Sequence, residues 1–318
     1  MIATLTTGDF IRRNGLIIAF AAILAIVALS APTFLTVGNL LGVLRQIAIV
    51  GTIAVGVTFV VISGRLDLSV GSGLTFLSVL VVSQHNQIGP AGALAVTLCC
   101  GLLIGACNGF LVAYLRFDSL IATLAMLSLL QGVTIWYSGG ANVNVADSTT
   151  WFSFFGRGSV LGIPAPVLLL VLGAAVAGFV LMRTRFGRAV FAVGGNETAS
   201  IFSGIAAPRI VFATYLISGL ATACAAIIMG SRVMGAQSTI GQGYELTVLA
   251  GIILGGTSLL GGYGSIWRTI VGVAMLGFIE NGLILMGFPY YVQWLVTWAI
   301  VIMAVWIDLA AKRGRLLA

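Results

Sequence analysis

Side chains that could carry proton or cation chemistry are few in this sequence. Only eight of its 318 residues are Asp or Glu, and one is His. Glu280 stands out because it lies near the middle of a long apolar run, beside Asn281. An ionisable group at that depth in a membrane segment is costly and suggests a function. Two interpretations stay open: a proton or cation site, or a buried carboxylate that hydrogen-bonds a neighbouring helix.

Two further carboxylates, Asp67 and Glu245, lie where apolar runs begin. Each is expected to cap a helix, because acidic side chains accept backbone N–H groups and suit the helix dipole. Asn108 follows Asp67 at nearly the same separation as Asn281 follows Glu245. The two segments would enter from opposite faces, which predicts an inverted repeat of spans two to five and seven to ten. Inverted repeats are typical of transporters, so these residues and Glu280 are candidates for pathway or structural polar contacts.

Motifs for nucleotide, metal or covalent chemistry are missing from the sequence. The only lysine is Lys312, and a Walker A loop needs Lys followed by Ser or Thr. No zinc motif or nucleophile elbow occurs. The single histidine, His85, falls in a polar stretch, residues 84–90, that we expect to be a solvated loop. We therefore expect no catalytic residue, metal site or cofactor in this chain, and no enzyme activity of its own.

The composition predicts an all-α, polytopic membrane protein that carries these residues on long helices. Hydrophobic residues make up 60% and charged residues 7%, with a mean hydropathy of +1.16, whereas about a quarter of residues in soluble domains are charged. A helix needs about 20 apolar residues to cross a hydrocarbon core of about 30 Å. We predict a single transmembrane domain over residues 1–318 with ten spans, of which the third and eighth are short and Gly-rich and could be tilted or broken. The spans lie near residues 15–31, 40–62, 69–83, 91–115, 120–137, 164–182, 210–230, 245–261, 266–287 and 290–308.

The cations predict the orientation in the membrane. Positive charge accumulates on the cytoplasmic side of membrane proteins. With a cytoplasmic N-terminus, Arg45, Arg157 and Arg232 lie toward the outer face, and both termini are cytoplasmic. The net charge of +7 is then a topology signal rather than a sign of nucleic-acid binding. The inner cations are Arg12, Arg13, Arg65, Arg116, Arg183, Arg185, Arg188, Arg209, Arg268, Lys312, Arg313 and Arg315.

The cytoplasmic loop of residues 183–209 is the longest polar, basic interruption of the sequence. Asn196 could cap a short helix whose positive N-terminus suits Glu197, and Gly204 could end it. Two glycines before the cap would permit a tight turn. A loop this structured predicts a docking surface for a cytoplasmic partner. Its candidate residues are Gly194, Gly195, Asn196, Glu197, Ser203, Gly204 and Ile205.

Short segments spread over nearly the whole chain resemble, in order, the ribose-type permease family of bacterial ABC importers, which serve carbohydrate uptake of the second class. They are Phe34-Leu35-Thr36, Asn39-Leu40, Leu44-Arg45-Gln46, Asp67-Leu68-Ser69-Val70-Gly71-Ser72, Asn108-Gly109, Ile121, Thr123-Leu124, Phe186-Gly187-Arg188, Gly194-Gly195-Asn196, Ser203-Gly204-Ile205, Gly243-Tyr244-Glu245-Leu246, Gly255-Gly256-Thr257-Ser258-Leu259, Gly261-Gly262 and Asn281-Gly282-Leu283. The sequence departs from the family pattern at Arg65, Ser119 and Arg268.

The resemblance implies a ten-helix permease of the bacterial inner membrane that works as a homodimer or heterodimer. It implies two cytoplasmic ATPase domains, which use ATP and Mg, and a periplasmic solute-binding protein that delivers the substrate. Residues 194–205 would be the coupling helix that seats in the ATPase. The implied function is ATP-driven import of a monosaccharide or similar small polar solute, along a pathway with mostly apolar walls.

Three alternatives remain beside the sugar importer. An ion-coupled secondary transporter would use Glu280 as its proton or cation site and would transport without an ATPase. A passive channel or structural membrane subunit would need no energy source. An ABC permease for an amino acid would share the broad fold. The coupling-type loop and the missing nucleotide motif favour the importer.

Overall fold

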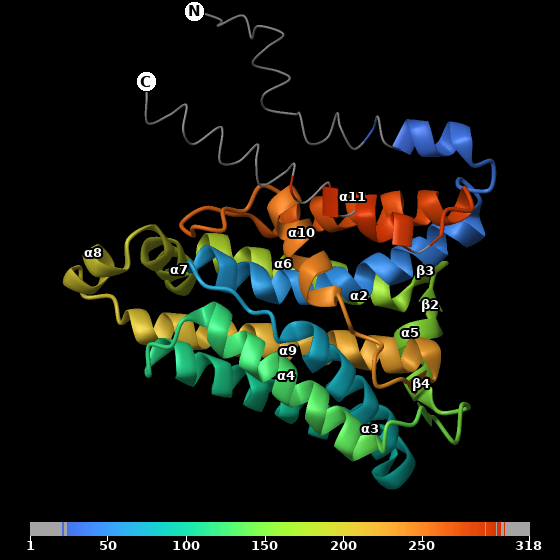
Figure 1. Cartoon of the computed structure of the whole chain (residues 1–318), viewed down its shortest axis with the longest axis horizontal. Coiled ribbons are helices and arrows are strands. Elements are labelled where there is room, and N and C mark those ends of the chain that lie inside the picture. Colours follow the sequence, from blue (N-terminus) through green and yellow to red (C-terminus); the bar gives the residue numbers. More distant parts are fainter. Residues whose placement is uncertain (1–20, 22–23, 290, 297, 300–301, 303–318) are drawn as a thin grey trace, which may run out of the picture.

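A computed structural model describes residues 21, 24–289, 291–296, 298, 299 and 302. Long apolar helices lie side by side and dominate the molecule (Figure 1). This confirms a helical, polytopic membrane protein. About half of each of the first and last predicted spans lies outside the described residues, as do both termini. Six described helices are long and apolar enough to cross a membrane: α2 (Val37–Ile62), α3 (Val70–Ala113), α4 (Ser119–Ser138), α6 (Ala165–Arg183), α9 (Ala207–Val233) and α11 (Ile266–Leu285).

Helix α3 contains a sharp break. Gly89 has φ +76°, a conformation that glycine adopts without strain, and Pro90 follows it. The 44 residues of α3 would extend about 66 Å if straight, roughly twice the thickness of the hydrocarbon core. α3 instead consists of two halves that pack on α9 in opposite directions. Contacts run from Gly73 beside Thr222 to Val81 beside Gly230 in the first half, and from Gly101 beside Gly219 to Gly109 beside Phe212 in the second.

The prediction of a solvated loop at residues 84–90 was wrong. The first half of α3 stays helical up to Gly89, and His85 is buried at 5% exposure. Its Nε2 lies 2.8 Å from Oγ1 of Thr150, and its ring lies 5.1 Å from that of Phe152. The segment after α4 therefore folds over His85, which the linear sequence could not indicate.

Short elements gather at one end of the helices, here named the strand end (Figure 1). They include η1 (Trp151–Ser153) and α5 (Phe154–Arg157). Arg157 donates from Nε to the carbonyl oxygen of Arg232 at 2.9 Å, so two of the three predicted outer arginines lie together here. Strands β1 (Val143–Asn144) and β4 (Gly235–Ala236) pair antiparallel, as do β2 (Ser159–Val160) and β3 (Ile163–Pro164).

The opposite end, named the α8 end, carries α7 (Arg185–Gly195) and α8 (Glu197–Phe202), and α8 projects from the bundle (Figure 1). The predicted inner residues Arg65, Arg116 and Glu197 line one cavity there. Arg65 and Arg116 thus lie at the opposite end of the bundle from Arg157 and Arg232, which the sequence assigned to the other face.

Helix α10 (Tyr244–Leu254) begins inside the bundle rather than at its surface. From β4 the chain turns back between the helices, where Gln131 donates to the carbonyl of Ser238 at 2.9 Å. The N–H of Gly241 then donates to Oγ1 of Thr75, in the second turn of α3, at 3.0 Å. The 11 residues of α10 extend only about 16 Å, half the hydrocarbon core. Of the two alternatives for the eighth span, tilted or broken, the short α10 favours the broken one, and its predicted start at the outer face was wrong.

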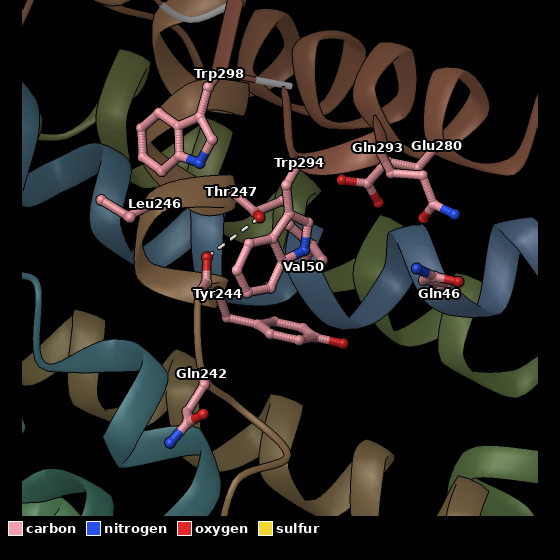
Figure 2. Close-up of a pocket in the computed structure, with 11 residues that line it drawn as sticks. Gln46, Val50, Gln242, Tyr244, Leu246, Thr247, Glu280, Gln293, Trp294 and Trp298 are labelled. Carbon is pink, nitrogen blue, oxygen red and sulfur yellow. Dashed lines mark hydrogen bonds between the residues drawn. The ribbon is translucent and has the colours of Figure 1, made fainter. Parts of the chain in front are cut away.

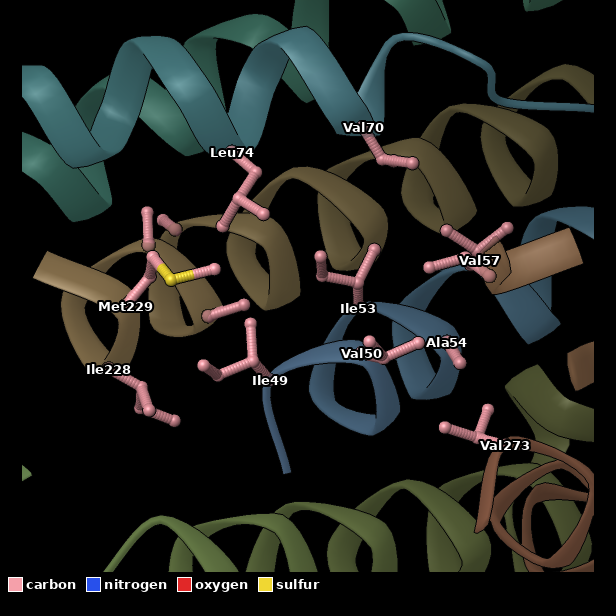
Figure 3. Close-up of a cluster of buried hydrophobic side chains, with 14 of the residues drawn as sticks. Ile49, Val50, Ile53, Ala54, Val57, Val70, Leu74, Ile228, Met229 and Val273 are labelled. Carbon is pink, nitrogen blue, oxygen red and sulfur yellow. The ribbon is translucent and has the colours of Figure 1, made fainter. Parts of the chain in front are cut away.

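The apolar core lies where α2, the first half of α3, α9, α10 and α11 meet (Figure 3). Ile53 and Leu74 are fully buried in it. Close helix contact here depends on small residues, because lipid tails give no hydrophobic drive for helices to associate. A Cβ on Gly105 would overlap the backbone carbonyl of Tyr215, so the second half of α3 touches α9 backbone to backbone.

Candidate functional site

The projecting helix α8 is built as the sequence predicts. Oδ1 of Asn196 accepts from the N–H of Ala199 at 2.9 Å, which caps the helix. Gly204 has φ +81° and follows the last turn, where few residues but glycine avoid strain. Ile201 is 49% and Phe202 87% exposed. A short, capped helix therefore presents two large apolar side chains at the α8 end.

The glycine pair before this helix has a different role from the predicted turn. Gly194 and Gly195 are the last residues of α7. A Cβ on Gly194 would overlap the carbonyl oxygen of Ile62 and lie 2.7 Å from the nitrogen of Gly262. Gly262 in turn donates to Ile62 at 2.9 Å. Gly194 thus lets the base of α8 contact the end of α2 and the segment after α10 directly.

An ion pair joins α8 to the connection between α2 and α3. Nη2 of Arg65 lies 2.6 Å from Oε2 of Glu197, and the two side chains are 31% and 40% exposed. Pairs with that much solvent contact contribute about 0–1 kcal/mol to stability. The ion pair therefore serves mainly to hold α8 against this connection rather than to stabilise the fold. Because Arg65 departs from the family pattern, the sequence offered no signal for this pairing.

A polar cavity of about 500 Å³ lies beside the ion pair. Arg65, Arg116, Asp118 and Glu197 contribute its charged groups. Asp118 accepts from the N–H of Leu120 at 2.9 Å and so caps α4. The α8 end thus combines an exposed apolar helix with a charged recess.

Buried polar groups cluster around Asp67, just beyond Arg65. Asp67 is 2% exposed. Its carboxylate accepts from the N–H of Ser69 at 3.1 Å, from Oγ of Ser69 at 2.6 Å and from Oγ of Ser218 at 2.7 Å. Asn108 donates to Oγ of Ser69 at 2.7 Å. Together these bonds connect both halves of α3 to α9.

The predicted capping role of Asp67 needs correction. Ser69 occupies the N-cap position of α3, and Asp67 precedes it by two residues. Burial raises the pKa of Asp67, while the hydrogen bonds from Ser69 and Ser218 lower it in part. The carboxyl therefore organises a crossing point of three segments rather than one helix end.

The second pair of the proposed repeat is arranged differently. Asn281 and Asn39 exchange two side-chain hydrogen bonds of 2.9 Å, which join α11 to the start of α2. Glu245 lies against Gly71 in the first turn of α3. Asp67 and Asn108 are thus linked through Ser69, whereas Glu245 and Asn281 have separate partners. The inverted repeat stays a prediction.

Glu280 lines a cavity of about 220 Å³ at the start of α10 (Figure 2). Its carboxylate and the amides of Gln46 and Gln293 gather on one side. The indoles of Trp294 and Trp298 lie on the other. Sequence reasoning singled out Glu280 but missed the glutamines and tryptophans, because they come from distant segments.

Comparisons with known proteins match nearly the whole chain. The family model described as branched-chain amino acid transport system / permease component covers residues 39–305. The ribose import permease protein of Escherichia coli strain K12 is 40% identical over 95% of both chains. That of Bacillus subtilis strain 168 is 38% identical over 93% of this chain and 92% of its own. The L-arabinose ABC transporter permease protein of Azospirillum brasilense is 35% identical over 96% and 90%. No solved structure matches.

These relatives confirm the resemblance to ribose-type permeases, and the family consists of transport components rather than enzymes. Helices of membrane-spanning length agree with a multi-pass protein of the inner membrane. The chain belongs to the family of branched-chain amino acid transport system / permease components, in which its curated relatives are sugar import permeases.

Proposed function

We propose that this chain is the membrane subunit of an ATP-driven ABC importer that moves a monosaccharide, or a similar small polar solute, from the periplasm to the cytoplasm. The observation that carries the proposal is α8, which projects Ile201 and Phe202 from the α8 end. Two relatives named for ribose and L-arabinose support the sugar. Since the sequence has no Walker A motif, ATP and Mg belong to the partner.

In this proposal α8 is the coupling helix and seats in a cytoplasmic ATPase. Exposed apolar side chains at the centre of an interface, with charged groups around them, are typical of protein docking. The cavity that contains Arg65, Arg116 and Asp118 would supply the charged surroundings. Nucleotide-driven movement of the ATPase would then reach α8 first.

Two contacts would transmit that movement into the bundle. The first is the backbone contact of Gly194 with Ile62 at the end of α2. The second is the pair of Arg65 with Glu197, followed two residues later by Asp67. Packed helices switch between discrete arrangements rather than deforming continuously. The Asp67 cluster would move as one unit with the α3–α9 crossing.

The complete assembly would contain two permeases, as a homodimer or heterodimer, two ATPase domains and a periplasmic binding protein. We further propose ten spans, both termini in the cytoplasm and one domain over residues 1–318. The α8 end then faces the cytoplasm and the strand end faces the periplasm. Arg65 and Arg116 in the cavity at the α8 end support this orientation, because positive charge accumulates on the cytoplasmic side.

A reconstitution tests the proposal. Proteoliposomes would contain the chain with its ATPase, with binding protein and labelled D-ribose or L-arabinose outside. We expect uptake that requires ATP and both partners. Phe202→Asp should release the ATPase. Trp136→Ala, which changes an 81% exposed residue on α4, should retain it. Uptake by the isolated chain that an uncoupler abolishes would instead establish a secondary transporter.

A further inference from the structure

The cavity beside Glu280 lies toward the strand end of the bundle, and Trp294 on its wall is 62% exposed. Gln46 lies nine positions after Val37, where α2 begins, and Glu280 lies five positions before Leu285, where α11 ends. Asn39 and Asn281 join these two helix ends. At about 1.5 Å per residue, the cavity is roughly 8–14 Å below the strand end of both helices. A solute arriving from that end would reach the cavity before the middle of the bundle.

The start of α10 forms one wall of this cavity. Gly243, Tyr244 and Thr247 belong to its first turn and line the cavity, and Gly243 has φ +84°. Interrupted helices that begin inside a membrane bundle mark substrate sites in transporters, because their first N–H groups lack partners in the helix. Here the N–H groups of Tyr244 and Thr247 already bond to the carbonyls of Gly241 and Gly243, so the helix start meets the cavity through its side chains.

The side chains divide the cavity into an aromatic and a polar side (Figure 2). Trp294 and Tyr244 contribute aromatic rings, while Gln46, Gln293 and Glu280 contribute amide and carboxylate groups. Amides both donate and accept hydrogen bonds, and a carboxylate accepts them. A monosaccharide has the complementary surface: a face of C–H groups that stacks on an aromatic ring, and an edge of hydroxyls that donate and accept.

Size and charge agree with that ligand. The volume of about 220 Å³ is more than tenfold the space of about 10–15 Å³ that holds one water. Among the described lining residues Glu280 is the one carboxylate, and none is Lys or Arg. A zwitterionic amino acid would bring its carboxylate close to Glu280, and no Lys or Arg among the described lining residues offsets that repulsion. An uncharged polyol meets no such penalty.

We propose that this cavity is a saccharide-binding site within the permease itself, with Trp294 and Tyr244 stacking on the sugar and Glu280, Gln46 and Gln293 binding its hydroxyls. The proposal rests on the proposed function and adds the place and residues of recognition. It also replaces the expectation of mostly apolar pathway walls at this level of the bundle.

Direct binding to the assembled importer tests the site. The permease with its ATPase would be placed in nanodiscs without the binding protein, and binding of labelled D-ribose and L-arabinose would be measured, with labelled L-leucine as the amino-acid probe. We expect saturable binding of at least one sugar. Trp294→Ala and Glu280→Gln should each weaken it at least tenfold, and Trp294→Phe, which keeps a ring, less than threefold.

Trp136→Ala is the matched control, since it removes an indole that is 81% exposed on α4. It should leave sugar binding unchanged. The amount of ATPase bound to each variant is measured first, to show that the complex has assembled. If a cavity variant does not assemble, Gln46→Ala is tested in its place. Absence of saturable sugar binding, or equal binding in wild type and the cavity variants, overturns the site.

Uptake by the same complexes, with ATP and binding protein, separates this proposal from the proposed function. Normal sugar uptake without sugar binding in the cavity would overturn the proposed site but not the proposed importer. Uptake of L-leucine but of neither sugar would overturn the proposed sugar importer. Saturable L-leucine binding that depends on Glu280 would overturn the assignment of the cavity to a saccharide.

Discussion

Arg65 and Glu197 are 132 positions apart in the sequence, yet Nη2 of one lies 2.6 Å from Oε2 of the other. The pair joins α8 to the connection that leads from α2 into α3. Asp67, two positions after Arg65, bonds to α9 through Ser218. A displacement of α8 therefore has a short, contiguous route to a buried polar crossing in the bundle.

Breaking this pair should weaken coupling more than stability. Arg65→Ala and Glu197→Gln each remove an exposed ion pair worth about 0–1 kcal/mol, so yield and assembly should stay near wild type. Sugar transported per ATP hydrolysed should fall several-fold in reconstituted importer. The double variant Arg65→Glu/Glu197→Arg, which restores an ion pair with the charges exchanged, should recover part of the lost transport per ATP. Arg116→Ala, which removes a cation from the same cavity but leaves the ion pair, should cost less transport, and an equal loss there would assign the effect to general charge.

Gly204 should be required for coupling but not for insertion. It has φ +81°, which costs a branched residue about 1–2 kcal/mol, and a Cβ there would meet open space. Gly204→Val should therefore redirect the chain after α8 without a steric clash. We expect normal membrane levels, continued ATP hydrolysis and at least a tenfold loss of uptake. Gly204→Asn, which tolerates this conformation, should retain more activity.

Gly132→Val serves as the control for the added branched side chain, because nothing lies within 4 Å of a Cβ at that position in α4. It should retain uptake. Wild-type uptake by Gly204→Val would contradict a role of the α8 terminus in coupling.

Local signals in the sequence predicted α8 well. A cap, an acidic first turn and a terminating glycine act within a few residues, so Asn196, Glu197 and Gly204 were enough to define the helix. The six described helices of membrane-spanning length were equally accessible, because apolar length alone identifies them.

Features that depend on contacts between distant segments were not accessible. Nothing adjacent to His85 indicates that Thr150 and Phe152 will cover it. Likewise, the position of Glu245 depends on how far the chain turns back between helices before α10. The cavity beside Glu280 combines α2, α10, α11 and residues after α11, and a linear pattern does not record that convergence.

Asp67 should make the stability of the protein depend on pH. Burial raises its pKa above 3.8, so the folded state favours the protonated form. The stabilisation is full below the unfolded pKa and is lost as pH rises through the folded pKa. Thermal unfolding in detergent between pH 4 and 8 should show wild type losing stability relative to Asp67→Asn as pH rises. A constant difference would contradict the raised pKa.

Asp147 provides the comparison of opposite sign. It lies in the exposed segment at the strand end, where hydrogen bonds from Thr149 lower its pKa. Any contribution of Asp147 is present above the unfolded pKa and is lost as pH falls. Asp147→Asn should therefore not reproduce the trend of Asp67→Asn.

The contact between α3 and α9 should tolerate no side chain at Gly105. A Cβ there would overlap the carbonyl of Tyr215, and the two backbones cannot separate locally because Gly101 and Gly219 are in similar contact four residues away. Overpacking typically costs about 1–3 kcal/mol, and more where backbone must move. Gly105→Val should lower the yield of folded protein and its unfolding temperature, measured by size-exclusion chromatography and thermal unfolding. Gly173→Val, at an open position on α6, should change neither, because nothing lies within 4 Å of its Cβ. If both variants unfold at the wild-type temperature, the halves of α3 do not pack on α9 this closely, and Asp67, Ser69 and Ser218 could not meet as described.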